Sequence, residues 1–280
     1  IPQTAQPQYL RFLLQVLHME SQLDHVSIST DMAIDTFARC DSDYAILDKM
    51  FTMHLNLGDH EYLKQIMSYV YVSRDGLMED EIWSLVRLKL GNMPEPRNRR
   101  NFQIIISDMT MIVDGRLCYS HVIYKTAVYN RYIFSNANAI RLHLDMAKYF
   151  TQLPASPRKL VCLPHHLQIA GIWSKVKNCL TDISNFQLWW TDAFKADFMK
   201  FWASLTAKSD LLMEKVKTGA ERPTFDIVDE YVKSLEEYRI KTKPTPSDEN
   251  VANIVLNIAD FLIEFSTLGH EEAADVPSSF

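Results

Sequence analysis

Apolar side chains recur every three to four residues along most of this 280-residue chain, which is the spacing of one face of an α-helix. The first such segment, residues 7–19, places Tyr9, Leu13 and Leu17 on one face, and Pro7 suits a first helical turn. Glycine, which a turn-rich all-β fold needs, occurs only seven times, whereas aromatic residues make up 11% of the chain. We therefore predict a mainly α fold.

The same spacing predicts a succession of helices separated by short polar segments. Asn56-Leu57-Gly58-Asp59 is typical of one helix ending and the next beginning, and residues 268–275 resemble the start of a further helix. The predicted helices span residues 7–19, 32–38, 44–55, 60–72, 78–91, 102–109, 121–134, 138–150, 158–170, 172–181, 193–206, 225–239 and 251–267.

One segment departs from the helical pattern. Residues 111–121 contain two β-prone runs joined by Asp114-Gly115, which is the strongest short hairpin signal in the chain. Three predicted helices precede it, and three helices followed by a β-hairpin is the layout of a winged helix. His121 lies where the strand pattern gives way to a helical one. The sequence therefore predicts a winged-helix domain with His121 at the end of its wing.

The chain lacks the motifs that usually carry catalysis. It has no G-x-x-x-x-G-K-[ST], H-E-x-x-H, C-x-x-C or G-x-S-x-G, and its glycines never fall at dinucleotide-binding spacing. His165 and His166 are adjacent, so on a helix they point about 100° apart and suit a metal site poorly. The acids of Glu79-Asp80-Glu81 suit a helix N-terminus. We predict that this chain is not an enzyme and holds no metal and no cofactor of its own.

Composition limits which partners and which cellular compartment are expected. The net charge is −6, with acidic and basic residues mixed along the chain, and no apolar run reaches the roughly 18 residues of a membrane span. The four cysteines have no paired spacing, which favours reduced thiols in a cytoplasmic protein. We expect protein partners and no membrane. The chain starts without methionine and stops within a pattern, so we interpret it as an internal piece of a longer protein.

A winged helix raises the question of nucleic acid. The basic run 97–100, with Arg97, Arg99 and Arg100, favours DNA binding, but the helix expected at 102–109 is apolar and carries almost no side chains that read bases. Nucleic acid is therefore the least favoured partner, and a DNA-binding winged helix is kept as a second alternative function.

The segment 186–202 is rich in aromatic residues. Trp190, Phe194, Phe198 and Phe201 follow one another at helical spacing. They predict either a helix-packing core or a partner-binding groove, because exposed aromatic patches mark interfaces. The candidates for partner binding are Trp189, Trp190, Phe194, Phe198, Phe201 and Trp202.

In order along the chain, several segments resemble the part of a STAND-class signalling NTPase (NACHT and NB-ARC families) that follows its nucleotide-binding core. "PQYLRFLLQVLHM" resembles a helix of the small helical domain, and "IMSYVYVSRDGLMEDEIWSLV" and "IVDGRLCYSHVIYKTAVYNRY" resemble the opening and close of the winged helix. "LPHHLQIAGIWSKVKNCLTDISNF" is similar to the helical unit that follows in nephrocystin-3-like and telomerase-associated-protein-like chains. "VANIVLNIADFLIEFSTLGHEEAAD" looks like a first tetratricopeptide (TPR) unit.

The resemblance implies a role for His121. The histidine that closes the winged-helix hairpin in this family contacts the β-phosphate of bound ADP, and His121 occupies the matching position. The nucleotide-binding loop itself is absent from this chain, so ADP or ATP is expected only with an upstream nucleotide-binding domain. Without that domain, His121 is expected to pack as a structural joint.

The resemblance also implies an order of domains along the chain and a ranking of the possible functions. We predict a small helical domain at 1–58, a winged helix at 59–134, a helical arm at 135–240, and a linker leading into a TPR-like solenoid at 241–280. The favoured function is a non-catalytic protein-interaction scaffold, with its neighbours being an upstream NTPase domain and downstream TPR repeats. The alternative is the regulatory half of an ATP/ADP-driven switch. By analogy, the setting is a ciliary or axonemal assembly.

Overall fold

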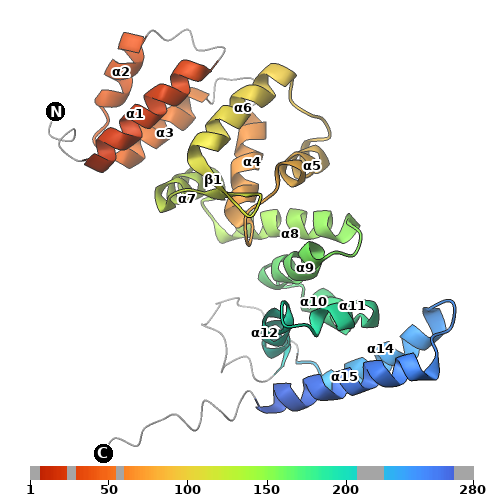
Figure 1. Cartoon of the computed structure of the whole chain (residues 1–280). Helices are drawn as coiled ribbons and strands as arrows, with labels where there is room; N and C mark the ends of the chain where they lie inside the picture. The colour runs from red at the N-terminus through yellow and green to blue at the C-terminus, as the bar shows by residue number, and fades with distance from the viewer. Residues whose placement is uncertain (1–6, 24–29, 55–59, 207–223, 268–280) are drawn as a thin grey trace, which may run out of the picture. The chain divides into compact units, whose positions relative to one another are not determined.

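A computed structural model of the chain describes residues 7–23, 30–54, 60–206 and 224–267. These residues are mainly helical, with one two-stranded antiparallel sheet, as the sequence predicts (Figure 1). The contacts divide the chain into two compact units, residues 1–149 and 150–280, and each unit is described by itself. The four domains expected from the sequence stay a prediction.

The elements of unit 1 are α1 (Pro7–Gln22), α2 (Thr30–Ala38), α3 (Asp43–His54), α4 (His60–Val72), α5 (Glu79–Leu90), α6 (Pro96–Met109), β1 (Thr110–Val113), β2 (Arg116–Tyr119), α7 (Val122–Val128), the π-helix η2 (Tyr129–Ile133) and α8 (Asn136–Gln152), which continues into unit 2. Unit 2 adds α9 (Pro157–Ile169), α10 (Trp173–Thr181), α11 (Ile183–Trp189), α12 (Lys195–Leu205), α14 (Ile227–Lys241) and α15 (Asp248–Thr267).

Helix α4 forms the centre of unit 1. It contacts α5, α7, η2 and β2, and its buried residues include Leu63, Ile66 and Tyr69, so it is enclosed around most of its circumference. Tyr119 of β2 donates its hydroxyl to the carbonyl of Met67 in α4, at 2.7 Å, and this bond is buried. The β-hairpin is therefore attached to the central helix by its second strand.

The hairpin has the turn that its sequence predicts. Asp114 and Gly115 both have positive φ, at 51° and 75°, as a two-residue turn between twisted strands requires. Outside the hairpin, Leu77 pairs with Leu117 through two backbone hydrogen bonds of 2.7 and 3.2 Å. That bridge ties the segment between α4 and α5 to the edge of β2.

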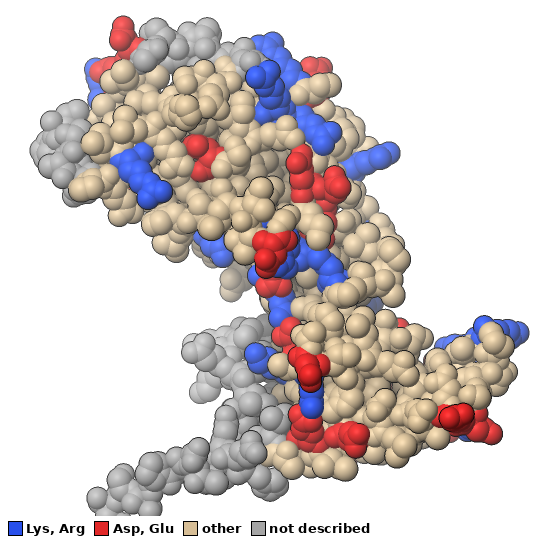
Figure 2. Space-filling model, in the orientation of Figure 1, with Lys and Arg blue, Asp and Glu red and all other residues tan. Residues whose placement is uncertain are grey.

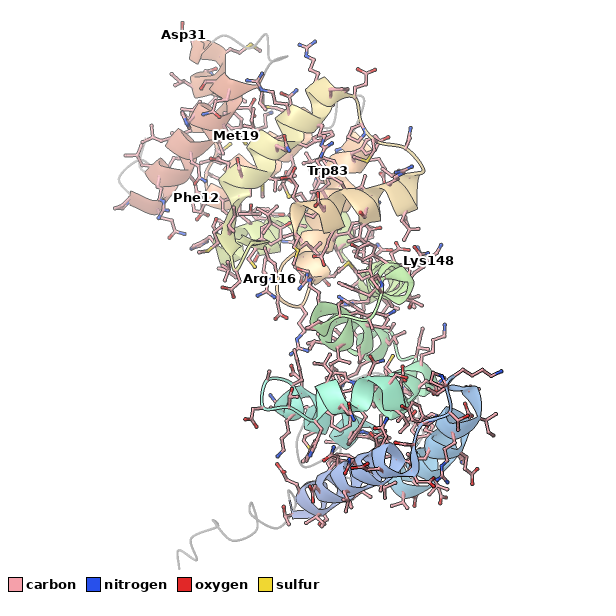
Figure 3. The ribbon with its side chains drawn as sticks, turned by 45° about the vertical axis from the view of Figure 1, so that its right-hand side comes forward. Phe12, Met19, Asp31, Trp83, Arg116 and Lys148 are labelled. Carbon is pink, nitrogen blue, oxygen red and sulfur yellow. The ribbon has the colours of Figure 1, made fainter. Side chains whose placement is uncertain are left out.

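Helix α1 packs against α2, α3 and α6. Phe12 and Met19, both labelled in Figure 3, are buried, and the Tyr9 hydroxyl donates to the carbonyls of Phe37 and Cys40. Side-chain packing and hydrogen bonds thus join the first helices to the rest of unit 1, and among the described residues no strand or disulfide takes part in this junction.

Unit 2 is built around Phe261 of α15. The rings of Phe186, Phe198 and Tyr231 lie 6.3, 4.9 and 5.9 Å from its ring, and they come from α11, α12 and α14. Helices α14 and α15 lie side by side in Figure 1, joined by a short loop. Edge-to-face and tilted aromatic contacts thus hold four helices around one side chain.

Several predicted helix bounds were wrong, each for a local reason. Helix α6 begins at Pro96 and includes the arginine run, because proline is favoured in a first turn and arginine is a good helix former. Helix α11 was missed, and the chain turns between Trp189 and Lys195 where a continuous helical face was expected. The loop expected at 241–250 is shorter, since α15 already begins at Asp248. The predictions at 56–59 and 268–275 lie outside the described residues.

Gly76 and Gly91 provide a matched test of the contact between β2 and the segment before α5. Both have φ of +82°, but a Cβ at Gly76 would collide with Cys118 Sγ and lie 2.7 Å from Leu117 O, whereas one at Gly91 meets nothing within 4 Å. We expect Gly91→Ala to lower the free energy of unfolding by about 1 kcal/mol from backbone strain alone, and Gly76→Ala by about 3 kcal/mol because overpacking is added. Urea unfolding measures both, and equal losses would contradict the close packing at Gly76.

Candidate functional site

His121 caps the N-terminus of α7. Its Nδ1 accepts a hydrogen bond from the backbone N–H of Ile123, at 3.2 Å, and its ring meets Phe12 edge-on with the ring centroids 5.7 Å apart. The residue as a whole is exposed, so the packing expected of a structural joint is limited to the face toward Phe12. Its cap bond engages Nδ1 and leaves the other ring nitrogen, Nε2, for a ligand.

A cleft of about 430 Å³ lies beside His121. It is lined by Pro7, Gln8, Arg11, Phe12, Gln15, Ser120, His121 and Tyr124. The guanidinium of Arg11 and the imidazole of His121 are both able to donate to an anion there. Burial raises the pKa of the Tyr124 phenol to about 12, so this hydroxyl stays protonated at neutral pH. The role of His121 in nucleotide sensing stays a prediction.

The six aromatic candidates lie in different environments. Trp189, Phe198, Phe201 and Trp202 are buried in the core of unit 2, as the packing alternative predicts. Trp190 and Phe194 are half-buried, and both lie in the turn between α11 and α12 and not on a helix. Lys195 places its ammonium 4.4 Å from the centre of the Trp190 ring. Any partner contact by this group is therefore confined to Trp190 and Phe194.

A groove of about 420 Å³ lies between α9 and α10. Its floor includes the buried side chains of Leu160, Leu163 and Leu167, and its rim includes Lys175 and Asn178, which are exposed. An apolar floor with a few polar groups at its edge is the usual composition of a ligand site. The rim residues lie one turn apart on α10, so their side chains point toward the same part of the groove.

Pro164 lies within α9 and lines this groove. Because proline has no N–H, the helix loses the hydrogen bond that the carbonyl of Leu160 accepts in a regular helix. This groove was not predicted from the sequence, in which Pro164 indicates only an irregularity of the helix.

A second cleft of unit 2, about 490 Å³, lies between α10 and α14. Lys177 of α10 and Glu230 of α14 form a half-buried ion pair of 2.6 Å at its wall. Acidic and basic side chains alternate around this cleft, including Lys233 and Glu237. This mixture selects no single charge of ligand, and the ion pair serves to join the two helices.

The arginine run lies in the first turns of α6. The Arg99 guanidinium stacks over Trp83 of α5, 4.7 Å from the ring centre, and lies 3.9 Å from Glu79. Phe102 and Ile105 of the same helix are buried, and α6 contacts α1 and β1. The apolar side of α6 is thus occupied by packing within unit 1.

The described residues provide neither a cluster of metal ligands nor a helix suited to a membrane. They include no group of three histidine, cysteine or acidic side chains placed to hold a metal ion. No helix in these ranges combines the length and the apolar character that crossing a membrane requires.

Comparison with known proteins gives one distant likeness. No family model and no solved structure matches the chain. A TPR repeat-containing protein of Dictyostelium discoideum is 23% identical to it over 161 residues, which is 57% of this chain and 9% of that protein. The chain thus spans less than a tenth of its relative's length. The likeness indicates TPR-like helical repeats and adds no evidence for a NACHT or NB-ARC relationship.

The pair of Lys177 and Glu230 predicts a pH dependence of stability. The hydrogen bond from Lys177 holds the pKa of Glu230 below its ordinary value of 4.5. Because the folded-state pKa is lowered, the stabilisation is present above about pH 4.5 and is lost as the pH falls through the lowered value. We expect Lys177→Met to cost about 1 kcal/mol at pH 7 and much less at pH 3.

Urea unfolding across this pH range measures the difference between the two proteins. The exposed pair of Lys241 and Glu237 is the control, and Lys241→Met should change stability little at any pH. A cost of Lys177→Met that stays constant down to pH 3 would contradict the assignment.

Proposed function

We propose that this chain is a non-enzymatic scaffold segment of a larger protein and that it binds other proteins through helical packing surfaces. The groove between α9 and α10 is the observation that carries the proposal, and the likeness to a TPR repeat-containing protein supports it. Helix pairs such as α9 with α10 and α14 with α15 begin, in this proposal, a TPR-like solenoid. A groove between repeat helices is a usual place for such arrays to bind a peptide.

Unit 1 contributes a winged helix to this proposal. Helices α4, α5 and α6 would be its three helices, and β1 and β2 its wing, with Leu77 completing the strand contacts through Leu117. The parent protein is then of the STAND type, and unit 1 acts as the rigid joint between its core and its repeats. The DNA-binding alternative is not favoured, because Arg99 stacks over Trp83 and Gln103 donates to Glu79, so both side chains are engaged within unit 1.

The chemistry of the groove suggests its ligand. Leu163 and Leu167 offer an apolar floor, and Lys175 has no ion-pair partner among the described residues. Lys159, by contrast, donates to the backbone carbonyls of Thr151 and Leu153 and is already engaged. The ligand is therefore an extended protein segment with an apolar side chain for the floor and a carboxylate for Lys175.

Ala155→Trp tests the groove, because Ala155 is exposed at its edge and a large ring there would fill it. The probe is a random peptide library displayed on phage and selected against the intact chain. We expect enriched apolar–acidic peptides that bind with Kd of about 1–100 μM and that lose at least about tenfold on Ala155→Trp or Lys175→Glu.

Ala196→Trp is the matched control, since Ala196 is exposed on α12 away from the groove, and it should bind the peptides normally. The proposal fails if no peptide is enriched, or if the selected peptides bind all variants alike. Turnover of ATP by the purified chain would independently contradict the non-enzymatic part of the proposal.

The cleft at His121 supports a second candidate function, the regulatory half of a nucleotide switch. It brings Arg11 of α1 together with Ser120 and His121, which lie between β2 and α7. In this proposal a phosphate of ADP held by an upstream core is bound there, which ties that core to unit 1 in the resting state.

Adding ADP to the intact chain tests this second function. The ADP concentration has to be millimolar, because a single phosphate contact without the upstream core gives weak binding. We expect the imidazole proton resonances of His121, identified by their loss in His121→Gln, to shift with ADP but not with adenosine. Arg11→Ala should remove the shift, whereas Arg158→Ala in unit 2 should leave it. Equal shifts with adenosine, or none with ADP, would exclude phosphate recognition at this cleft.

A further inference from the structure

Helix α15 is apolar on two opposite faces. Its inner face, Val251, Ile254, Ile258, Phe261 and Phe265, is buried in unit 2. Its outer face has a second stripe at spacings of four, three and four residues: Ala252, Leu256, Ala259 and Ile263. Leu256 and Ile263 remain 62% and 65% exposed. We call this second stripe the outer stripe.

A helix on the outside of a domain normally has a polar outer face, because apolar side chains there lose no contact with water on folding. A contiguous exposed apolar stripe at helical spacing instead marks a surface that another helix covers. The outer stripe spans residues 252–263, or about 16 Å along the axis at 1.5 Å per residue. This length matches about three turns of a packed partner helix.

The charged residues of α15 itself are all acidic. Helix α15 contains Asp248, Glu249, Asp260 and Glu264 and no lysine or arginine. Glu249 and Asp260 lie next to the stripe, three residues before Ala252 and three before Ile263. Figure 2 shows acidic side chains toward both ends of α15, with uncharged surface between them. A partner helix therefore lies next to negative charge at this stripe, and basic side chains beside its own apolar stripe would be attracted to that charge.

The last turns of α15 show how a cation is held at this flank. A shallow hollow of about 480 Å³ is lined by Trp190, Lys195, Asp260, Ile263, Glu264 and Thr267. Lys195 lies over the Trp190 ring and forms an ion pair with Glu264. Asp260 has no ion-pair partner among the described residues, so one carboxylate in the hollow is left for a basic group from outside.

We propose that the outer stripe of α15 is a docking site for an amphipathic helix of a partner protein, with a stripe of leucine-like side chains flanked by lysine or arginine. The apolar side chains would cover Leu256 and Ile263, and a basic side chain would face Asp260 beside Trp190. A second copy of α15 fits poorly, because its own acidic flank would be repelled. The inference deepens the scaffold function and uses a surface separate from the α9–α10 groove.

Fluorescence anisotropy with a synthetic peptide tests the site on the intact chain. The probe is a labelled 18-residue helix with leucines at spacings of three and four and lysines beside them, and its twin carries glutamate in place of lysine. We expect a Kd of about 1–50 μM for the basic helix at 50 mM salt and at least about tenfold weaker binding of the acidic twin.

Variants locate the binding. Leu256→Glu and Ile263→Glu should each weaken the basic helix at least about tenfold, and Asp260→Lys should weaken it and reduce its salt dependence. Ile240→Glu is the control, because Ile240 of α14 is equally apolar and 77% exposed but lies outside the stripe. Ala155→Trp should also leave this binding unchanged, which separates the outer stripe from the groove.

Three results would overturn the proposal. Equal binding of both peptides shows nonspecific apolar adsorption, and binding that survives Leu256→Glu and Ile263→Glu places the peptide elsewhere. Dimerisation of the chain that Ile263→Glu abolishes identifies a second copy as the occupant, which sedimentation equilibrium measures. If the basic helix does not bind but the groove peptides still do, the docking site on α15 is excluded while the scaffold function remains supported.

Discussion

The burial of α4 on nearly all sides is the constraint on which unit 1 depends. A helix so enclosed needs neighbours on every face, and α5, α7, η2 and β2 supply them. The hydroxyl of Tyr119 binds the Met67 carbonyl, which holds β2 against α4. The chain leaves β2 at Ser120 and enters α7 at Val122, so the position of His121 follows directly from this packing. Its cleft with Arg11 exists because α1 reaches the same end of unit 1.

A comparable constraint acts in unit 2, where Phe261 gathers aromatic rings from α11, α12 and α14. Once Trp189, Phe198 and Trp202 are buried there, they are unavailable to a partner. Trp190 stays half-buried and the outer stripe of α15 stays exposed, and the two meet at the hollow beside Asp260. The core of unit 2 thus decides which of its many apolar residues are free for recognition.

Sequence reasoning was most accurate where the determining physics is local. Helical spacing predicted 60–72 as it is found in α4, and Asp114-Gly115 predicted the hairpin, because positive φ at both positions favours those residue types. It was wrong at Trp190 and Phe194, whose spacing imitates a helical face although the chain turns there. It also missed the α9–α10 groove, since a groove is formed by two helices and has no pattern within either one.

The sequence by itself therefore determined the class of the fold, most of the described helices and the β1–β2 hairpin, because backbone propensity and turn chemistry act over a few residues. Only the tertiary structure decided which apolar residues are core and which are surface. Phe261 and Ile263 are two residues apart on one helix, yet the first is fully buried and the second is 65% exposed. That difference depends on rings contributed by Phe186, Phe198 and Tyr231, which are distant in sequence and meet α15 only in the folded unit.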